Sequence, residues 1–438
     1  MMEYKNTREF AVEADKNDTL KSFKNKFIIP QHNGKDTVYL CGNSLGLQPV
    51  DALKSIEQEL KDWGTFGVEG HFQAKNPWYS YHESLMEPAA NIVGARKNEV
   101  VHMNGLSANI HLLMVSFYRP TKTRFKILCE KKAFPSDQYI LESQVKFHGY
   151  LPAEAIIEME PRENEHNIRL EDILEAIEKN KESLALVFIG GVNYYTGQVF
   201  DMAAITIAGH AAGAIVGFDL AHAVGNIEMQ LHNWQVDFAA WCTYKYLNSG
   251  PGSVGGIFVH ENHANRPELP RFAGWWGHDK ESRFAMEPGF KPMPGAEGWQ
   301  LSNAPVFSMA IHKVSLELFN EAGMKALREK SVLLSGYLLF ILKELIDKNK
   351  EACIEIITPE KENERGCQLS ILFHKNGKKI FEHLTKEGVV VDWREPNVVR
   401  MAPVPLYNSF MDVFQFGKVL ERGVVDSSLV DSIFNGKW

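Results

Sequence analysis

The sequence has few cysteines, no long apolar run and no excess of positive charge. Its five cysteines among 438 residues are widely spaced and form no CxxC pair. This argues against structural zinc and a disulfide framework, and favours a reducing cytosol. The net charge of −8 leaves no basic footprint for nucleic acid. The most apolar stretches, residues 205–218 and 332–346, are too short to span a membrane. Residues 1–18 lack the apolar segment of a secretory signal.

What the sequence does contain is an alternation of apolar runs and helical patterns between about residues 90 and 260. Short, nearly continuous apolar runs occupy residues 125–130, 183–189, 212–219 and 236–243, and a charged helical stretch occupies 170–182. Strands that are apolar on both faces, separated by helices, are typical of a parallel sheet buried between helices. The pattern therefore predicts an α/β domain that binds its ligand beyond the carboxyl ends of the strands.

The remainder of the chain predicts a second, smaller domain. From Ala310 a long helical pattern runs through residues 332–346, followed by strand-like runs at 353–359, 367–374 and 389–394. Residues 262–305 are rich in Pro, Gly and Trp and lack a regular period. We expect an N-terminal segment, 1–75, that joins the small domain, a large α/β domain, 76–310, and a small α+β domain, 311–438.

The most informative residue is Lys245, which follows an apolar run and precedes the glycine-rich segment 250–256. A second apolar run ends in Asp219, with His222 close behind. Taken alone, Asp219 reads as an ordinary helix cap. An aspartate and a lysine that each end a strand are the pair that a pyridoxal phosphate (PLP) site requires. The lysine forms a Schiff base with the aldehyde, and the aspartate keeps the ring nitrogen protonated.

Four further segments carry candidate residues, each with an ordinary alternative. Ser107 begins a helical pattern suited to binding phosphate, and is otherwise a simple cap. In residues 134–137, Phe134 could stack on a ring, although Pro-Ser-Asp is also a common turn. Trp275 lies in a loop that covers either a ligand or a partner subunit, or is packed on the surface. Arg400 suits a carboxylate ligand or a structural ion pair equally well.

Together these segments resemble those of the kynureninase family, whose members are PLP enzymes of fold type I (aspartate aminotransferase-like). The resemblance covers nearly the whole chain and rests on separated strings in the same order: GNSLGLQP (42–49), EGH (69–71), FPSD (134–137), GVNYYTGQ (191–198), GFDLAHAVGN (217–226), YKYLN (244–248), GWWGH (274–278), PGAEGWQLSN (294–303), ERGCQLS (364–370) and APVPLYNSF (402–410). It implies a large domain with a mainly parallel sheet, a smaller C-terminal domain, and a homodimer. Thr243 departs from the family, where serine is common, as does Met401, where a branched aliphatic residue is common.

The resemblance also implies roles for individual residues. Lys245 and Asp219 would be catalytic, and no metal is expected. The cofactor would be held by Leu106, Ser107, Phe134, Pro135, Ser136, Asp137, Asp219, His222, Tyr244, Lys245, Asn303 and a Trp275 supplied by the partner subunit. The substrate would meet Ser44, His71, Asn303 and, at its α-carboxylate, Arg400. His71 and Asn303 favour the 3-hydroxylated substrate.

The implied reaction is hydrolysis of the Cβ–Cγ bond of L-kynurenine or 3-hydroxy-L-kynurenine, which yields anthranilate or 3-hydroxyanthranilate and L-alanine. Three alternatives remain open at this point. A cysteine desulfurase of the same fold would need a mobile cysteine, and an aminotransferase would release a keto acid. A catalytically silent binding protein would have no use for Lys245, Asp219 and Arg400 together.

Overall fold

The computed structural model describes residues 3–264 and 266–435, without the side chains of Ala264 and of residues 427–435. The chain divides into two compact units. The larger contains residues 51–194 and 200–321, and the smaller contains 1–50, 195–199 and 322–438. In this division residues 51–75, which the sequence analysis placed with the small domain, belong to the larger unit.

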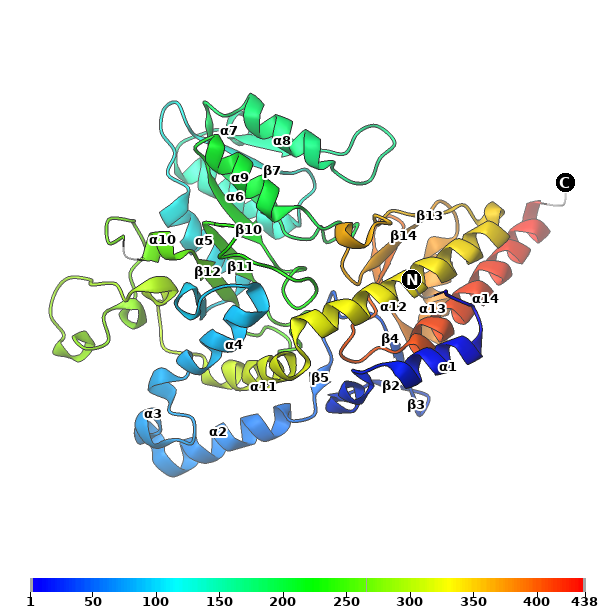
Figure 1. The fold of residues 1–438 in the computed structure, drawn as a ribbon, viewed down its shortest axis with the longest axis horizontal. Coiled ribbons are helices and arrows are strands. Elements are labelled where there is room, and N and C mark those ends of the chain that lie inside the picture. The colour runs from blue at the N-terminus through cyan, green and yellow to red at the C-terminus, as the bar shows by residue number, and fades with distance from the viewer. Residues whose placement is uncertain (1–2, 265, 436–438) are drawn as a thin grey trace. The chain divides into compact units, whose positions relative to one another are not determined.

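The larger unit is built on a seven-stranded sheet with the order β6-β12-β11-β10-β9-β7-β8. Figure 1 labels four of these strands, β7, β10, β11 and β12. Strands β8, β7, β9, β10 and β11 pair in parallel, while β12 runs antiparallel to both of its neighbours. The strands are β6 (Val100–His102), β7 (Lys126–Glu130), β8 (Ile156–Met159), β9 (Leu184–Gly190), β10 (Ile215–Asp219), β11 (Phe238–Trp241) and β12 (Gly256–Val259). The apolar runs at 125–130, 212–219 and 236–243 contain β7, β10 and β11, and the run at 183–189 contains all of β9 except its last residue, so the predicted fold class is confirmed.

Helices pack on this sheet. Helix α5 lies against β11 and α6, and α9 lies against β10 and α8. The helices of this unit are α2 (Ala52–Phe66), α3 (Gly70–Gln73), α4 (Glu83–Val93), α5 (Leu106–Phe117), α6 (Pro135–Phe147), α7 (Pro152–Ala155), α8 (Leu170–Lys179), α9 (Met202–Ala211), α10 (Glu261–Ala264) and α11 (Val306–Ala322).

Close packing in the core depends on one glycine of β10. A Cβ atom on Gly217 would lie 2.3 Å from the ring of Phe238 on the neighbouring strand. The Phe238 ring in turn stacks on Phe117 of α5, with 4.8 Å between their centroids. Any larger residue at 217 would displace the ring, because protein interiors are close-packed. This contact fixes β10 and β11 side by side, and both strands lead into the site described below.

The smaller unit has its own sheet and core. Its four strands pair antiparallel in the order β13-β14-β17-β16. The Leu-rich face of α12 packs with α14 and with this sheet. The elements are α1 (Arg8–Asn17), β1 (Phe27–Ile28), β2 (Gln31–His32), β3 (Lys35–Asp36), β4 (Val38–Tyr39), β5 (Gln48–Pro49), α12 (Met324–Lys348), β13 (Ile354–Ile356), β14 (Leu369–Phe373), α13 (Gly377–Lys386), β15 (Val389–Val390), β16 (Asp392–Arg394), β17 (Val398–Met401) and α14 (Phe410–Asn435).

One helical prediction needs correction. The pattern from Ala310 onward suggested a single long helix, but the structure has two, α11 and α12, separated at Gly323. Gly323 has a φ of 76°, a conformation that glycine adopts without strain and that ends a helix. The apolar period continues across the break, which is why the sequence pattern did not reveal it.

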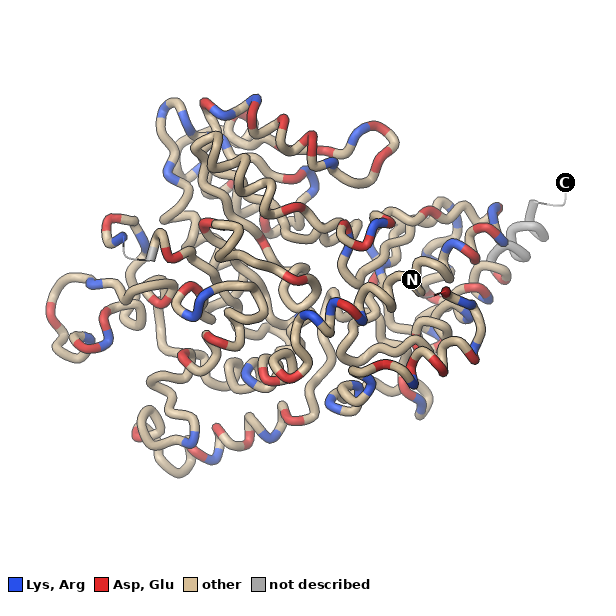
Figure 2. Tube along the Cα trace, viewed as in Figure 1, with Lys and Arg blue, Asp and Glu red and all other residues tan. Residues whose placement is uncertain are grey.

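Charges of both signs are interspersed along both units (Figure 2). Within the described ranges, no helix combines the length and the apolar character needed to cross a bilayer.

Candidate functional site

A pocket of about 300 Å³ lies beyond the carboxyl ends of β7, β9, β10 and β11. Its lining comes entirely from the larger unit and includes the two residues on which the sequence analysis relied, Asp219 and Lys245. Other predicted residues in the lining are Leu106, Ser107, Phe134, Ser136, Asp137, His222 and Tyr244. The fold therefore assembles nine predicted residues from four separate segments at one place, where an α/β sheet places its ligands.

Asp219 and Asp137 form a buried pair of carboxyl groups at the floor of this pocket. Asp219 ends β10, is 7% exposed, and accepts a hydrogen bond of 2.7 Å from the Ala221 backbone N–H. Burial raises the pKa of Asp219, while that backbone bond and Lys245 oppose the rise. Burial and the neighbouring Asp219 raise the pKa of Asp137 well above its usual range. Asp137 therefore keeps a proton and donates it to Asp219, which is the more acidic of the two.

Lys245 lies in a turn that follows β11. Its Nζ atom is 3.0 Å from His222 Nε2, 5.8 Å from the centre of the Phe134 ring and 5.9 Å from that of Tyr244. Burial raises the pKa of the Tyr244 hydroxyl, so this group stays protonated and can donate a hydrogen bond. The amine is thus held among two aromatic faces and an imidazole, with the Asp137–Asp219 pair in the same pocket.

A buried hydrogen-bonded chain supports the lysine turn from behind. The Ser249 backbone N–H bonds the Thr243 carbonyl at 3.1 Å, and the Ser249 hydroxyl lies 2.7 Å from Nδ1 of His312. Nε2 of His312 lies 2.8 Å from Nε2 of His102. Burial lowers the pKa of His102 to about 3, and that of His312 well below its usual range, so both rings are neutral. Thr243, where the family often has serine, uses its hydroxyl to bond the Val254 carbonyl at 2.6 Å.

Two helix N-termini border the pocket. Helix α5 begins at Leu106 after Gly105, and no side chain caps it, so its first backbone N–H groups are available to an anion. Helix α6 begins at Pro135, a residue favoured at this position, and carries Phe134 and Ser136 beside it. The hydroxyls of Ser107 and Ser136 are 2.6 Å apart, and this bond joins the two helix starts. The arrangement suits a phosphate group at one end of the pocket.

Six predicted residues are absent from the lining. One of them, Pro135, begins α6 between Phe134 and Ser136, and the other five lie elsewhere. Trp275, 44% exposed, packs edge-on against Trp276 and Phe284. Neither it nor the exposed Asn303 lines the pocket. His71 bonds the Val68 carbonyl through Nδ1 at 2.9 Å and lies edge-on to Trp78. Ser44 and Arg400 belong to the smaller unit.

Arg400 is fully buried in β17, where it forms an ion pair with Asp392 of the neighbouring strand β16. Its Nη2 is 2.8 Å from one carboxylate oxygen and its Nε is 3.1 Å from the other. Asp392 therefore orients the Arg400 guanidinium, whether Arg400 forms only this structural ion pair or also binds the carboxylate of a ligand.

Seven residues of the lining were not predicted from the sequence: Gly105, Ala108, Glu130, Gly190, Val192, Tyr194 and Ala221. The ring of Tyr194 lies edge-on to Phe134, with 5.3 Å between centroids. The available signal was that Glu130 and Gly190 each follow an apolar run, as Asp219 does.

Sequence comparison places close relatives along the whole chain. The family described as Kynureninase C-terminal domain matches residues 327–420. A kynureninase of Flavobacterium psychrophilum is 58% identical over 426 residues, which cover 97% of this chain and 100% of the relative. A kynureninase of the sea anemone Nematostella vectensis is 48% identical and covers 94% of this chain and 93% of its own length.

Solved structures share the fold at low sequence identity. A cysteine desulfurase from Escherichia coli aligns with a TM-score of 0.74 at 16% identity and covers 92% of this chain and 98% of its own. A C-DES mutant with glycine covalently linked to its PLP cofactor aligns with a TM-score of 0.72 at 15% identity, over 88% and 96% of the two chains. At these identities the likeness establishes the fold alone.

Proposed function

The chain belongs to the kynureninase family, and we propose that it hydrolyses the Cβ–Cγ bond of L-kynurenine or 3-hydroxy-L-kynurenine with PLP as its cofactor. The products are anthranilate or 3-hydroxyanthranilate and L-alanine, in tryptophan catabolism and de novo NAD biosynthesis. The observation that carries this proposal is the meeting of Lys245 with the Asp137–Asp219 pair in one pocket.

The residues of the pocket fit this cofactor. Asp137 Oδ1 is buried without a hydrogen-bond partner among the described residues, as expected of a group that awaits a ligand. Lys245 would hold the aldehyde carbon, and Asp219 would hold the ring nitrogen with His222 and Asp137 nearby. Phe134 would stack on the ring, supported by Pro135. The N–H groups of Leu106 and Ser107, with the hydroxyls of Ser107, Ser136 and Tyr244, would bind the phosphate.

When bound, PLP supplies an electron sink for bonds broken next to the substrate amine. The protein must then move protons at defined atoms. Lys245 Nζ takes the substrate α-proton and returns it, since no other amine lines the pocket among the described residues. His222, 3.0 Å from Nζ, orients this amine. Asp219 is the more acidic of the pair because Asp137 donates the shared proton to it, and Asp219 is therefore the carboxylate suited to keep a ring nitrogen protonated.

We assign the substrate contacts to Ser44, His71, Asn303 and Arg400. Arg400 would bind the α-carboxylate with a guanidinium that Asp392 already orients. His71 and Asn303 would meet the aromatic end and favour the 3-hydroxylated form. We expect His71→Ala and Asn303→Ala to reduce kcat/KM for 3-hydroxykynurenine more than for kynurenine, in steady-state assays of both. Equal losses for the two substrates would contradict this assignment.

A homodimer in the cytoplasm is the assembly that we propose. Its support is a set of exposed apolar side chains on the larger unit, because large exposed apolar patches mark interfaces. They lie on α2 and α3 and the turn between them, and in residues 272–290: Leu53, Leu60, Trp63, Val68, Phe72, Phe272, Trp275, Phe284, Met286 and Phe290. Trp275 would then reach a cofactor in the partner subunit. Sedimentation of the holoenzyme tests this, and a monomer with full activity would refute it.

Product analysis separates this reaction from its rivals. A desulfurase requires a mobile cysteine, but Cys242 and Cys367 are buried, and burial raises the pKa of the Cys242 thiol. We expect purified protein with PLP to release L-alanine and anthranilate in equal amounts from kynurenine. A keto acid would indicate an aminotransferase. A protein that neither binds PLP nor cleaves either kynurenine would indicate a silent member.

A further inference from the structure

Glu130 is a third buried carboxyl group in the cofactor pocket. It is the last residue of β7 and only 3% exposed. The strand beside β7 is β9, which ends in Gly190, and the next is β10, whose last residue Asp219 pairs with Gly190. A Cβ atom on Gly190 would lie 3.0 Å from Glu130 Oε1. Because residue 190 has no side chain, the Glu130 carboxyl group can occupy the space beside it. Gly190 ends β9, which lies between β7 and β10, and these two strands end in Glu130 and Asp219.

Glu130 also contacts the segment that follows β9. Its Oε2 accepts a hydrogen bond of 3.0 Å from Asn193 Nδ2. The next residue, Tyr194, lines the pocket and lies edge-on to Phe134, the ring proposed to stack on the cofactor. The carboxyl group thereby holds the backbone segment from which Tyr194 projects. Through this segment, Glu130 helps to position the Tyr194 and Phe134 rings.

Acidic groups outnumber basic groups around Glu130 in the pocket. Burial, and then the nearby Asp219, raise the pKa of Glu130 to about 7, opposed by hydrogen bonds with Asn193 and the Gly190 backbone. Glu130 in turn contributes to the raised pKa of Asp137. The other titratable groups of this pocket are Lys245, His222 and Tyr244. Lys131, the next residue along the chain, forms its ion pair with Glu160 at the surface instead. Three acids thus face one lysine, and they must share protons at neutral pH.

We propose that Glu130 is a positioning residue of the cofactor site, which holds the segment 190–194 through Asn193 and shares protons with Asp137 and Asp219. Near neutral pH its ionisation adds negative charge beside these acids. That charge favours the protonated forms of the basic groups in the pocket, the ring nitrogen among them. This inference rests on the proposed function, since it concerns the same cofactor.

The test compares Glu130→Gln and Glu130→Ala with the wild-type holoenzyme. The absorbance of bound PLP is titrated against pH, and PLP affinity is measured by adding the cofactor to stripped protein. Glutamine keeps an acceptor for Asn193 but cannot ionise, so the midpoint of the titration should fall by about half a pH unit with affinity within about threefold of wild type. Alanine also removes the acceptor, and PLP affinity should fall about tenfold. Glu158→Gln, on the exposed face of β8, is the matched control and should change neither.

An unchanged midpoint in Glu130→Gln would overturn the proton-sharing role, whatever happens to activity. If Glu130→Ala does not fold, the glutamine variant alone decides. Failure of the proposed function itself would look different, because the wild-type protein would then bind no PLP or leave kynurenine intact. A wild-type protein that binds PLP and cleaves kynurenine, with a midpoint that Glu130→Gln does not move, would remove only the present inference.

Discussion

Buried acids lie at both ends of the parallel strands of the seven-stranded sheet, here called its carboxyl-end edge and its amino-end edge. The surroundings of these acids differ between the two edges. At the carboxyl ends of the parallel strands, Asp219, Asp137 and Glu130 face one another, and burial raises the pKa of each. At the amino ends, Asp237 and Glu99 are equally buried. There each carboxylate is surrounded by donors, and histidines replace the lysine. The two groups of acids therefore differ in the number of hydrogen-bond donors around them rather than in how deeply they are buried.

Asp237 precedes β11 and illustrates the amino-end edge. It accepts hydrogen bonds from the Val216 backbone at 2.7 Å, from His210 at 2.8 Å and from His263 at 2.7 Å. Burial acts to raise its pKa, but the bonds from His210, His263 and Val216 outweigh burial, and the pKa of Asp237 is lowered. An acid with this many donors is a fixed anion that joins β10, β11, α9 and α10.

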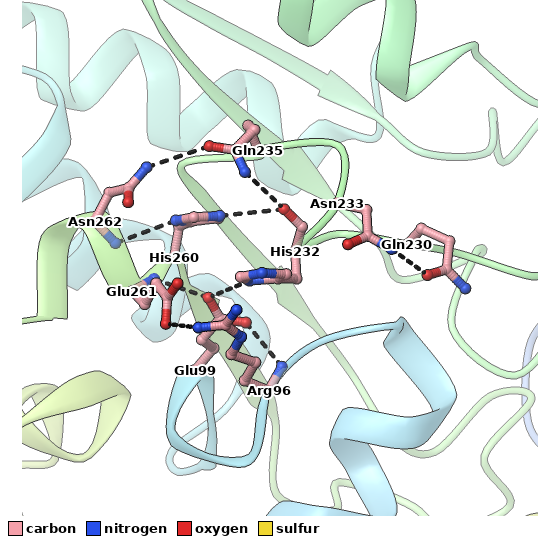
Figure 3. Close-up of polar contacts among 9 residues, drawn as sticks. All are labelled: Arg96, Glu99, Gln230, His232, Asn233, Gln235, His260, Glu261 and Asn262. Atoms are coloured by element: carbon pink, nitrogen blue, oxygen red, sulfur yellow. Dashed lines mark hydrogen bonds and ion pairs between the residues drawn. The ribbon is translucent and has the colours of Figure 1, made fainter.

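Glu99, which precedes β6 two strands away, is likewise surrounded by hydrogen-bond donors (Figure 3). It accepts backbone N–H bonds from Arg96 and Glu261, both of 2.8 Å, and its Oε1 lies 3.0 Å from His232 Nδ1. His260 stacks on His232, while its Nδ1 accepts the Asn262 N–H and its Nε2 meets the His232 carbonyl. Glu99, His232 and His260 are close enough to bind a metal. Both ring nitrogens of His260 already form hydrogen bonds within the protein, so we interpret the cluster as a structural network rather than a metal site.

The comparison predicts that the largest loss of function comes from the carboxyl-end edge. Lys245→Ala should abolish turnover and the visible absorbance of bound PLP, because no second amine among the described residues lines the pocket. Anthranilate fluorescence and an absorbance scan measure the two effects. The thermal melting temperature should remain near that of the wild-type apoprotein. A variant that kept full activity would remove Lys245 from the mechanism.

Asp219→Ala should reduce kcat severely, because a ring nitrogen that loses its partner is a poorer electron sink. We expect at least about tenfold, which corresponds to about 1.4 kcal/mol in the barrier. The matched change is Asp237→Ala, an equally buried acid at the opposite end of the sheet. If both variants lost kcat to the same extent, the functional distinction between the two edges would fail.

Asp237→Ala should instead act on stability. It leaves the Val216 N–H, His210 and His263 without their shared acceptor. Loss of one partner from a buried, hydrogen-bonded group costs about 2–4 kcal/mol. We expect a melting temperature lower by several degrees, with PLP affinity unchanged at temperatures where the variant is folded. Calorimetry and PLP titration of the same samples provide both numbers. Unchanged melting would show that the bonds of Asp237 contribute nothing to stability.

The sequence predicted the carboxyl-end edge better than the amino-end edge for a physical reason. Strands buried on both faces give apolar runs, so Asp219 and Lys245 stand out where those runs end. Asp237 lies inside the run that contains β11, and its partners His210 and His263 come from two separate helices. No local period links them. Glu130 was missed because it precedes two exposed lysines, Lys131 and Lys132, and reads as the start of a polar turn.

The smallest predicted effect concerns pH at the amino-end edge. The hydrogen bond with Asp237 raises the pKa of His210, and burial only partly opposes this. Protonated His210 therefore stabilises the fold, fully below its unfolded pKa of about 6.5 and less as pH rises through the higher folded value. His210 is 37% exposed, so solvent screens the pair. We expect His210→Gln to lower the melting temperature by about 1–2 °C near pH 5.5 and by less near pH 8.5. In an Asp237→Ala background the same substitution should show no such pH dependence, because the partner charge is gone. A cost that stays constant across this pH range in the wild-type background would mean that His210 acts through packing rather than through its charge.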